Sequence, residues 1–212
     1  MTPHIGVDES GKGDFFGPLI IAACYVGPEH LAELEGVRDS KKLTDPVSLR
    51  LAGKIKATCP HAVVAIGPSK YNELYLKFRN LNKLLAWGHA RAIENVLEQS
   101  PADLVISDQF ADPAGLKRQL FEKGRTITLQ SMVRAEADIA VAAASILARA
   151  EFLNRLKRLG EEFGMELPKG ASDLVLKAGA RFVQKHGQAE LSKVAKTHFK
   201  TYQNVLALVG QT

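Results

Sequence analysis

Near its start the chain reads His4-Ile-Gly-Val-Asp-Glu-Ser-Gly-Lys-Gly13, in which acidic residues and a glycine-rich turn follow a short apolar run. Residues 4–8 form a short β-type run that ends at Asp8, and a second acidic residue, Glu9, follows directly. After a glycine-rich turn, a second apolar run covers Leu19–Val26. Apolar runs bounded by Gly and Pro are typical of strands. The sequence therefore predicts two early strands, with carboxylates at the end of the first.

Further along the chain, strands alternate with helices. Apolar or alternating runs predict three more strands, at residues 62–66, Leu104–Asp108 and 125–129. Apolar spacing predicts helices at residues 82–99, from about Pro113, and at residues 135–159, and the basic C-terminus has room for two or three shorter ones. The helix predicted at residues 135–159 is almost wholly apolar over residues 140–148, so we expect that half of it to be buried. This order indicates an α/β domain: a mixed sheet flanked by helices, with a C-terminal helical part.

Composition sets the class of protein. The 212 residues are 46% hydrophobic and 24% charged, which excludes disorder and is enough for a core without disulfides. The two cysteines, Cys24 and Cys59, are too few for a disulfide framework, so we expect reduced thiols and a cytoplasmic protein. No apolar run approaches the roughly 20 residues of a membrane helix, and the first residues do not resemble a signal peptide.

Positive charge is concentrated near the C-terminus. The chain has 28 Lys and Arg against 23 Asp and Glu, and residues 151–212 hold 10 of the basic and 6 of the acidic side chains. A basic segment of this kind indicates a polyanionic partner such as nucleic acid. A solvated helix surface gives the same pattern, so charge alone leaves both interpretations open.

Four carboxylates stand at the ends of predicted elements. Asp8 and Glu9 end the first strand, Asp108 ends a later one, and Glu136 precedes the apolar half-helix. Ligand-binding groups gather at the carboxyl ends of strands in α/β sheets. If these side chains converge, their repulsion requires cations, and two Mg²⁺ ions suit such an oxygen-rich set.

Each carboxylate also has an ordinary explanation. Asp8 and Glu9 fit an exposed turn, Asp108 fits a strand-ending cap, and Glu136 fits a favourable charge in a first helical turn. The chain has no Cys/His zinc spacing, no Walker loop and no Gly-x-Ser-x-Gly elbow. Its six histidines are scattered, and surface or core-edge positions are the ordinary interpretation for most of them.

Six blocks of sequence together resemble the type 2 ribonucleases H, and within them the ribonuclease HIII branch. They extend over about residues 4–200 and read Val7-Asp-Glu-Ser-Gly-Lys-Gly-Asp-Phe-Phe-Gly-Pro18, Asp39-Ser-Lys-Lys-Leu-Thr44, Ser107-Asp108, Ala135-Glu-Ala-Asp-Ile-Ala-Val-Ala-Ala-Ala-Ser-Ile-Leu-Ala-Arg149, Leu167-Pro-Lys-Gly170 and Lys196-Thr-His-Phe199. The HII branch usually has Gly-Arg-Gly where this chain has Gly11-Lys12-Gly13.

The resemblance implies an RNase H-like fold and an endonuclease that hydrolyses the RNA strand of RNA·DNA hybrids, leaving 5′-phosphate and 3′-hydroxyl ends. It implies a monomer with two divalent ions, Mg²⁺ or Mn²⁺, held by Asp8, Glu9, Asp108 and Glu136. The implied substrate contacts are Ser10, Gly11, Lys12, Gly13, Ser40, Lys41, Lys42, Lys169, Lys196 and His198. A non-catalytic hybrid-binding module and a junction resolvase on the same fold are the alternatives.

Two features depart from the family pattern. Ribonucleases HIII typically carry an N-terminal domain of the TATA-binding-protein type, and here Asp8 stands seven residues from the first residue. We expect residues 1–212 to form one catalytic domain, with a core over about 1–160 and a basic helical part over about 161–212. Asp138 also competes with Glu136 for the fourth carboxylate position, and the branch pattern favours Glu136.

Overall fold

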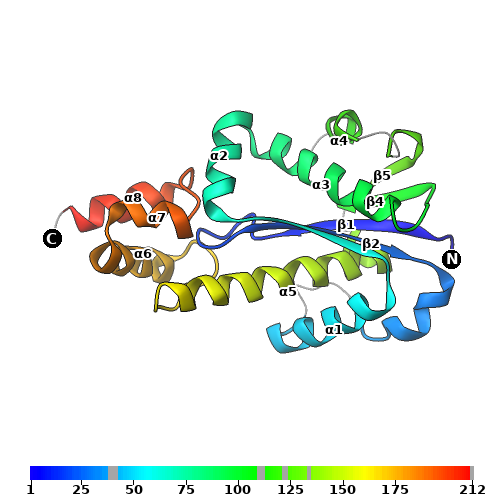
Figure 1. Cartoon of the computed structure of the whole chain (residues 1–212), viewed down its shortest axis with the longest axis horizontal. Coiled ribbons are helices and arrows are strands. Elements are labelled where there is room, and N and C mark those ends of the chain that lie inside the picture. Colours follow the sequence, from blue (N-terminus) through cyan, green and yellow to red (C-terminus); the bar gives the residue numbers. More distant parts are fainter. Residues whose placement is uncertain (38–42, 109–112, 121–123, 133–134, 211–212) are drawn as a thin grey trace. The chain divides into compact units, whose positions relative to one another are not determined.

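The computed structural model describes residues 1–37, 43–108, 113–120, 124–132 and 135–210 (Figure 1). Two compact units divide the chain. The sheet unit comprises Met1–Ser10, Ile20–Val64 and Asn80–Glu151, and the helical unit comprises Gly11–Leu19, Ala65–Arg79 and Phe152–Thr212. In the described residues, no helix is both long and apolar enough to cross a membrane.

Over the described residues, the sheet has five strands in the order β3-β2-β1-β4-β5. Their bounds are β1 His4–Ser10, β2 Leu19–Val26, β3 His61–Ile66, β4 Leu104–Asp108 and β5 Thr128–Met132. β1 pairs antiparallel with β2 and parallel with β4, and β4 pairs parallel with β5. The prediction of a mixed sheet is therefore confirmed, with the Asp8-Glu9 strand at its centre.

The helices complete both units. They are η1 Pro28–Leu34, α1 Asp45–Thr58, α2 Pro68–Phe78, α3 Leu81–Leu97, α4 Pro113–Gln119, η3 Gly124–Thr126, η4 Ala135–Ala137, α5 Ile139–Glu162, α6 Asp173–His186, α7 Gln188–Val194 and α8 Lys200–Val209. The C-terminal helices α6, α7 and α8 confirm the predicted helical part. In the helical unit, α6 packs against α7 and α8, and α2 packs against α7.

Two glycines let helices approach the two faces of the sheet. Gly6 of β1 lies against the backbone of Ala140 and Val141 in α5, where a Cβ atom would overlap both. Gly88 of α3 lies against Ile21 of β2. The first part of α5 therefore covers one face of β1, and α3 covers the other (Figure 1). The predicted burial of residues 140–148 is confirmed.

Two predicted boundaries are wrong, and two helices were not predicted. Where the sequence predicts a strand from residue 125, the chain forms a 3₁₀ turn, Gly124–Thr126, and β5 begins at Thr128. The long helix begins at Ile139 rather than at residue 135, because Asp138 caps it. Helices α1 and α2, which are less apolar on average than α5, were missed.

Candidate active site

Asp8 and Asp108 are brought together by the pairing of β1 with β4. The parallel register pairs Val7 with Ser107, so one further step along both strands sets Asp8 beside Asp108. Neighbouring strands lie about 5 Å apart, and paired residues of parallel strands point to the same face. Gly6, two residues before Asp8, faces α5. The two carboxylates therefore share the face of the sheet that α5 covers.

The Asp8 carboxyl group is held by two hydrogen bonds. The Glu9 N–H donates to Asp8 Oδ1 at 2.8 Å, and the Ser145 hydroxyl of α5 bonds the same carboxyl group. Burial, and next the charge of Glu9, nevertheless raise the pKa of Asp8 to about 6. A carboxylate whose ionisation is this unfavourable is stabilised by a nearby cation.

The Glu9 side chain lies on the opposite face of β1, towards α3. Glu9 pairs with Ile21, the residue that packs under Gly88, and its Oε2 lies 3.0 Å from Nε2 of the neighbouring His89. The His89 side chain is fully buried, and that of Glu9 is 11% exposed. His89 therefore fixes the orientation of the Glu9 carboxylate, and sequence reasoning, which treated the histidines as scattered, missed it.

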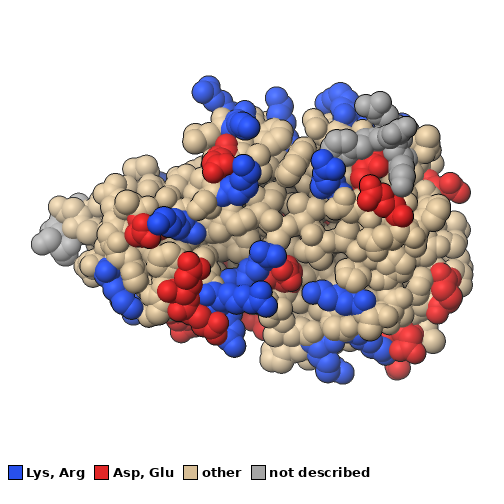
Figure 2. All heavy atoms as spheres, in the orientation of Figure 1, with Lys and Arg blue, Asp and Glu red and all other residues tan. Residues whose placement is uncertain are grey.

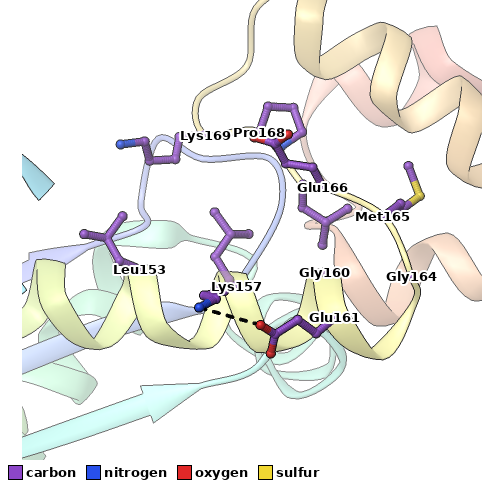
Figure 3. A pocket seen from close by; sticks show the side chains of 11 residues that line it. Leu153, Lys157, Gly160, Glu161, Gly164, Met165, Glu166, Pro168 and Lys169 are labelled. Carbon is purple, nitrogen blue, oxygen red and sulfur yellow. Dashed lines mark ion pairs between the residues drawn. The ribbon is translucent and has the colours of Figure 1, made fainter. Parts of the chain in front are cut away.

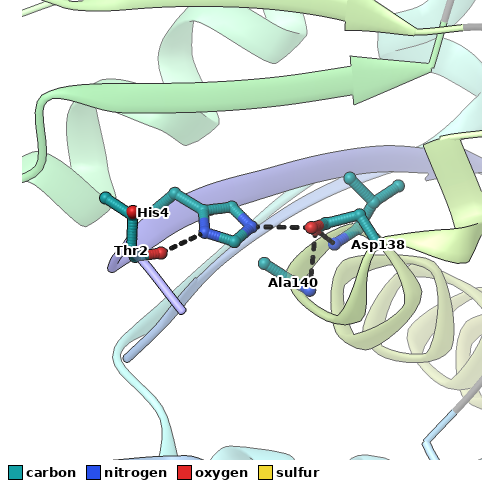
Figure 4. A network of polar contacts seen from close by, with 5 residues as sticks. Thr2, His4, Asp138 and Ala140 are labelled. Carbon is teal, nitrogen blue, oxygen red and sulfur yellow. Dashed lines mark hydrogen bonds and ion pairs between the residues drawn. The ribbon is translucent and has the colours of Figure 1, made fainter. Parts of the chain in front are cut away.

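Asp138 has a structural task at the start of α5 (Figure 4). Its Oδ1 accepts hydrogen bonds from the N–H groups of Ala140 at 2.9 Å and Val141 at 3.1 Å, and its Oδ2 lies 2.8 Å from Nε2 of His4. Burial opposes ionisation of Asp138, but the bond from His4 and the N–H donors outweigh it and lower the pKa. His4 gains a raised pKa from the same bond.

Glu136 lies in the 3₁₀ turn Ala135–Ala137, immediately before α5. The structure describes its backbone, whereas its side chain falls outside the described atoms. Among the side chains that are described, no three His, Cys, Asp or Glu residues are placed to hold a metal ion together. The donor chemistry still fits a divalent cation, because Asp8 and Glu9 are largely buried carboxylates, and burial and the charge of Glu9 make ionisation of Asp8 unfavourable.

The glycine-rich turn follows β1 directly and belongs to the helical unit. Ser10 is the last residue of β1, and the Asp14 N–H closes the turn on the Gly11 carbonyl at 3.3 Å. Gly11 has a φ of +89°, and a Cβ there would overlap the Pro18 carbonyl, so the turn requires glycine. Gly13 is exposed with open space around it, and Lys12 is half-buried. The turn therefore offers backbone groups at the surface.

The remaining predicted contacts have different surroundings. Ser40, Lys41 and Lys42 lie outside the described residues. Lys169 is exposed at the edge of a pocket of about 570 Å³, whose lining includes Leu153 of α5 and Met165 (Figure 3). This pocket contains none of the four predicted metal ligands.

In the last predicted block, Lys196 is buried, whereas the following residues, including His198, are half-buried. The His198 ring stacks on Tyr75 with centroids 4.1 Å apart. Lys196 is fully buried, which does not fit the expectation that it contacts a phosphate directly.

Part of the basic charge of the C-terminal segment is neutralised locally. Lys157 lies 3.7 Å from Glu161 and Lys193 lies 2.7 Å from Glu190. On the face in Figure 2, basic and acidic side chains are interspersed. On this face the charges therefore do not form one continuous basic surface.

Comparison with known proteins gives one consistent family. A model of the ribonuclease HII family matches residues 5–202. Ribonuclease HIII of Protochlamydia amoebophila is 48% identical over 213 residues, which cover 100% of this chain and 71% of that protein. Ribonuclease HIII of Chlamydia pneumoniae is 47% identical over 210 residues, covering 97% of this chain and 70% of that protein.

Solved structures agree with these relatives. The crystal structure of Bst-RNase HIII in complex with Mn²⁺ has a TM-score of 0.92 and 35% identity, over 100% of this chain and 71% of that one. RNase HII from Archaeoglobus fulgidus, solved with PCNA, has a TM-score of 0.77 and 28% identity, over 95% of this chain and 96% of that one. The chain therefore belongs to the ribonuclease HII family, and ribonucleases HIII are among its relatives.

Proposed function

We propose that this protein is a ribonuclease H that cuts the RNA strand of RNA·DNA hybrids and leaves 5′-phosphate and 3′-hydroxyl ends. The observation that carries the proposal is the register of β1 and β4, which sets Asp8 beside Asp108 at the centre of the sheet. Family membership and the likeness to Bst-RNase HIII, a structure that contains Mn²⁺, support the same reaction. We expect a cytoplasmic monomer.

In this proposal Asp8, Asp108 and Glu136, together with Glu9 from the α3 face of β1, hold two divalent ions, Mg²⁺ or Mn²⁺. Such ions supply an activated water and neutralise charge on the leaving 3′ oxygen. Ser145 and the Glu9 N–H orient the Asp8 carboxylate, and His89 orients that of Glu9. The capping and His4 contacts of Asp138 favour Glu136 as the fourth ligand, because Asp138 is already committed.

Recognition of RNA is proposed for the turn that follows β1. The 2′-hydroxyl group is what distinguishes RNA from DNA locally, and the backbone of the Gly11–Gly13 turn, which is exposed at Gly13, is suited to bind it. Ser10, Lys41, Lys42 and Lys169 are the further proposed substrate contacts, together with Ser40 and His198. We propose that residues 1–212 act as one catalytic domain on this substrate.

The test compares cleavage of three substrates of matched length: an RNA·DNA hybrid, a DNA duplex and a four-way DNA junction. We expect cutting of the hybrid alone, only with Mg²⁺ or Mn²⁺ and not in EDTA, and its loss in Asp8→Asn. Binding without cleavage would indicate a hybrid-binding module, and cutting of the junction would indicate a resolvase. Hybrids with one, four or many ribonucleotides then test the HIII assignment, for which poor cutting at a single ribonucleotide is expected.

A further inference from the structure

Lys196 is a fully buried cation with two specific acceptors. Its Nζ donates to the Asp14 carbonyl at 2.7 Å and to the Gly17 carbonyl at 2.8 Å. It also lies 5.6 Å from the centre of the Tyr71 ring, within the range of a cation–π contact. Asp14 and Gly17 belong to the segment Gly11–Leu19, which contains the glycine-rich turn. The side chain of Lys196 is therefore attached to the loop that we propose for ribose recognition.

The main chain around Lys196 holds the same loop. The Lys196 N–H donates to the Phe15 carbonyl at 2.9 Å, and the Gly17 N–H donates to the Val194 carbonyl at 2.9 Å. Phe16 and Ala195 form an isolated β-bridge between these bonds. The loop and the residues before Lys196 thus form a short two-stranded contact, and the Lys196 ammonium group closes it at the side.

Both partners of this contact are fixed from elsewhere in the helical unit. Asn72 of α2 donates to the carbonyls of Ser192 and Ala195, both at 3.0 Å, and accepts from the Thr197 N–H at 3.0 Å. On the loop side, the Asp14 carboxylate accepts from the Gly170 N–H at 2.6 Å, and the Phe15 N–H donates to the Gly170 carbonyl. The Lys196 ammonium group is therefore held between two anchored segments.

Burying this charge is unfavourable. Burial lowers the pKa of Lys196 to about 7, although the charge of Asp14 acts in the opposite direction. An apolar side chain of similar length would fill the same space without that penalty. Unlike an apolar side chain, a donor with several N–H groups can orient two carbonyl groups of one loop towards the same point.

We infer that Lys196 is a positioning residue for RNA recognition: it orients the Asp14 and Gly17 carbonyls and so fixes the Gly11–Gly13 turn in the conformation that binds the ribose. This inference rests on the proposed function, because it assigns a task to the turn proposed to read the 2′-hydroxyl group. Because Lys196 is fully buried, this positioning role replaces the phosphate contact expected from the sequence. The metal ligands of β1 and β4 are not part of this contact.

The experiment replaces the buried cation and measures RNA preference. Lys196→Met keeps the length and removes the donors, and Lys70→Met makes the same change at a side chain that is 63% exposed. Fluorescence anisotropy in EDTA gives the affinity for a labelled RNA·DNA hybrid and for the DNA duplex of the same sequence. Melting temperature checks folding, and kcat and KM are measured with Mn²⁺.

We expect Lys196→Met to lose about tenfold in hybrid affinity, the factor that corresponds to about 1.4 kcal/mol, and to bind the DNA duplex as the wild type does. KM for the hybrid should rise by a similar factor, with kcat nearly unchanged, and Lys70→Met should match the wild type. A purely structural role would instead weaken hybrid and duplex binding together, and that result overturns the inference.

The outcomes also separate the inference from the proposed function. A wild-type protein that neither cleaves the hybrid nor prefers it contradicts the proposed function, and the inference with it. A wild type that does both, with an equal preference in Lys196→Met, overturns the inference alone. If Lys196→Met does not fold, the comparison is made with Lys196→Leu, a smaller side chain that also has no donor, and a wild-type preference in that variant again overturns the inference.

Discussion

The contact between His4 and Asp138 leads to a prediction about how the free energy of unfolding depends on pH. His4 Nδ1 lies 2.7 Å from the Thr2 carbonyl oxygen and Nε2 lies 2.8 Å from Asp138 Oδ2 (Figure 4). Both partners accept hydrogen bonds, so only the imidazolium form of His4 donates to both, in agreement with its raised pKa. The side chains are only 5% and 18% exposed, so the ion pair is shielded from water.

Two substitutions at Asp138 separate the ion pair from the helix cap. Asp138→Asn keeps an N-cap oxygen for α5 but removes the charge, and a hydrogen bond between charged groups is worth about 1.5–3 kcal/mol. Asp138→Ala also removes the cap, at a further cost of about 1 kcal/mol. We therefore expect roughly 3 kcal/mol for Ala, which in a chain of this size lowers Tm by roughly 6–12 °C, and about two thirds of that for Asn.

The pH dependence follows from both pKa shifts. The raised pKa of His4 gives stability that is complete below its ordinary value of 6.5 and is lost as pH rises through the raised value. The lowered pKa of Asp138 gives stability that is present above 3.8 and is lost as pH falls through the lowered value. The difference between wild type and Asp138→Asn should therefore be greatest between these two ordinary values.

Urea unfolding of wild type, Asp138→Asn and Asp138→Ala at pH 5.5 and pH 9 tests this reasoning. The wild-type advantage over Asp138→Asn should shrink at pH 9, while the difference between Asn and Ala, which reports the cap alone, should stay constant. An Asp138→Asn difference that is the same at both pH values would refute the imidazolium assignment.

Three further predictions concern the site and its support. Asp8→Asn should abolish cleavage but leave Tm in EDTA at pH 7.5 unchanged or raise it. The reason is that the pKa of Asp8, about 6, makes its ionised carboxylate unfavourable in the folded protein at that pH. A clearly lower Tm by calorimetry would contradict this. His89→Gln should weaken Mn²⁺ binding by about 10- to 100-fold in titration calorimetry, because the orientation of Glu9 is lost, and an unchanged affinity would argue against that role. Gly6→Ala should destabilise the protein by about 3 kcal/mol or more, because its Cβ overlaps the α5 backbone. The control Gly53→Ala, in open space on α1, should instead stabilise it by up to about 1 kcal/mol. Equal effects of the two substitutions in denaturant unfolding would contradict the close approach of β1 and α5.

The sheet could be predicted because nearby residues in the sequence mark where its strands begin and end. Leu19–Val26 and Leu104–Asp108 agree residue for residue with β2 and β4, since Gly, Pro or charge bounds each apolar run. The start of α5 could not be predicted in the same way. Its cap, Asp138, is paired with His4 on β1, and that contact joins residues far apart in the sequence.

The candidate site shows the same division. Asp8 and Asp108 stand out in the sequence because each ends an apolar strand, and the register of β1 and β4 places them side by side. His89 could not be identified, because its pattern is that of any buried helix position until α3 is seen to cover Glu9. Lys196 looked like a surface cation in a basic segment, and only tertiary packing reveals that it is buried.

The position of β1 between β2 and β4 has a consequence for how the site assembles during folding. β1 meets β2 across a connection of eight residues, whereas it meets β4 only after about 100 residues of chain have been closed into a loop. Local pairings form early and distant ones late, because closing a long loop costs entropy before any contact compensates it. Asp8 and Asp108 therefore become neighbours only when the parallel half of the sheet has formed. A divalent ion that needs both carboxylates binds the native state and not its precursors, so it should slow unfolding without accelerating the early steps of folding.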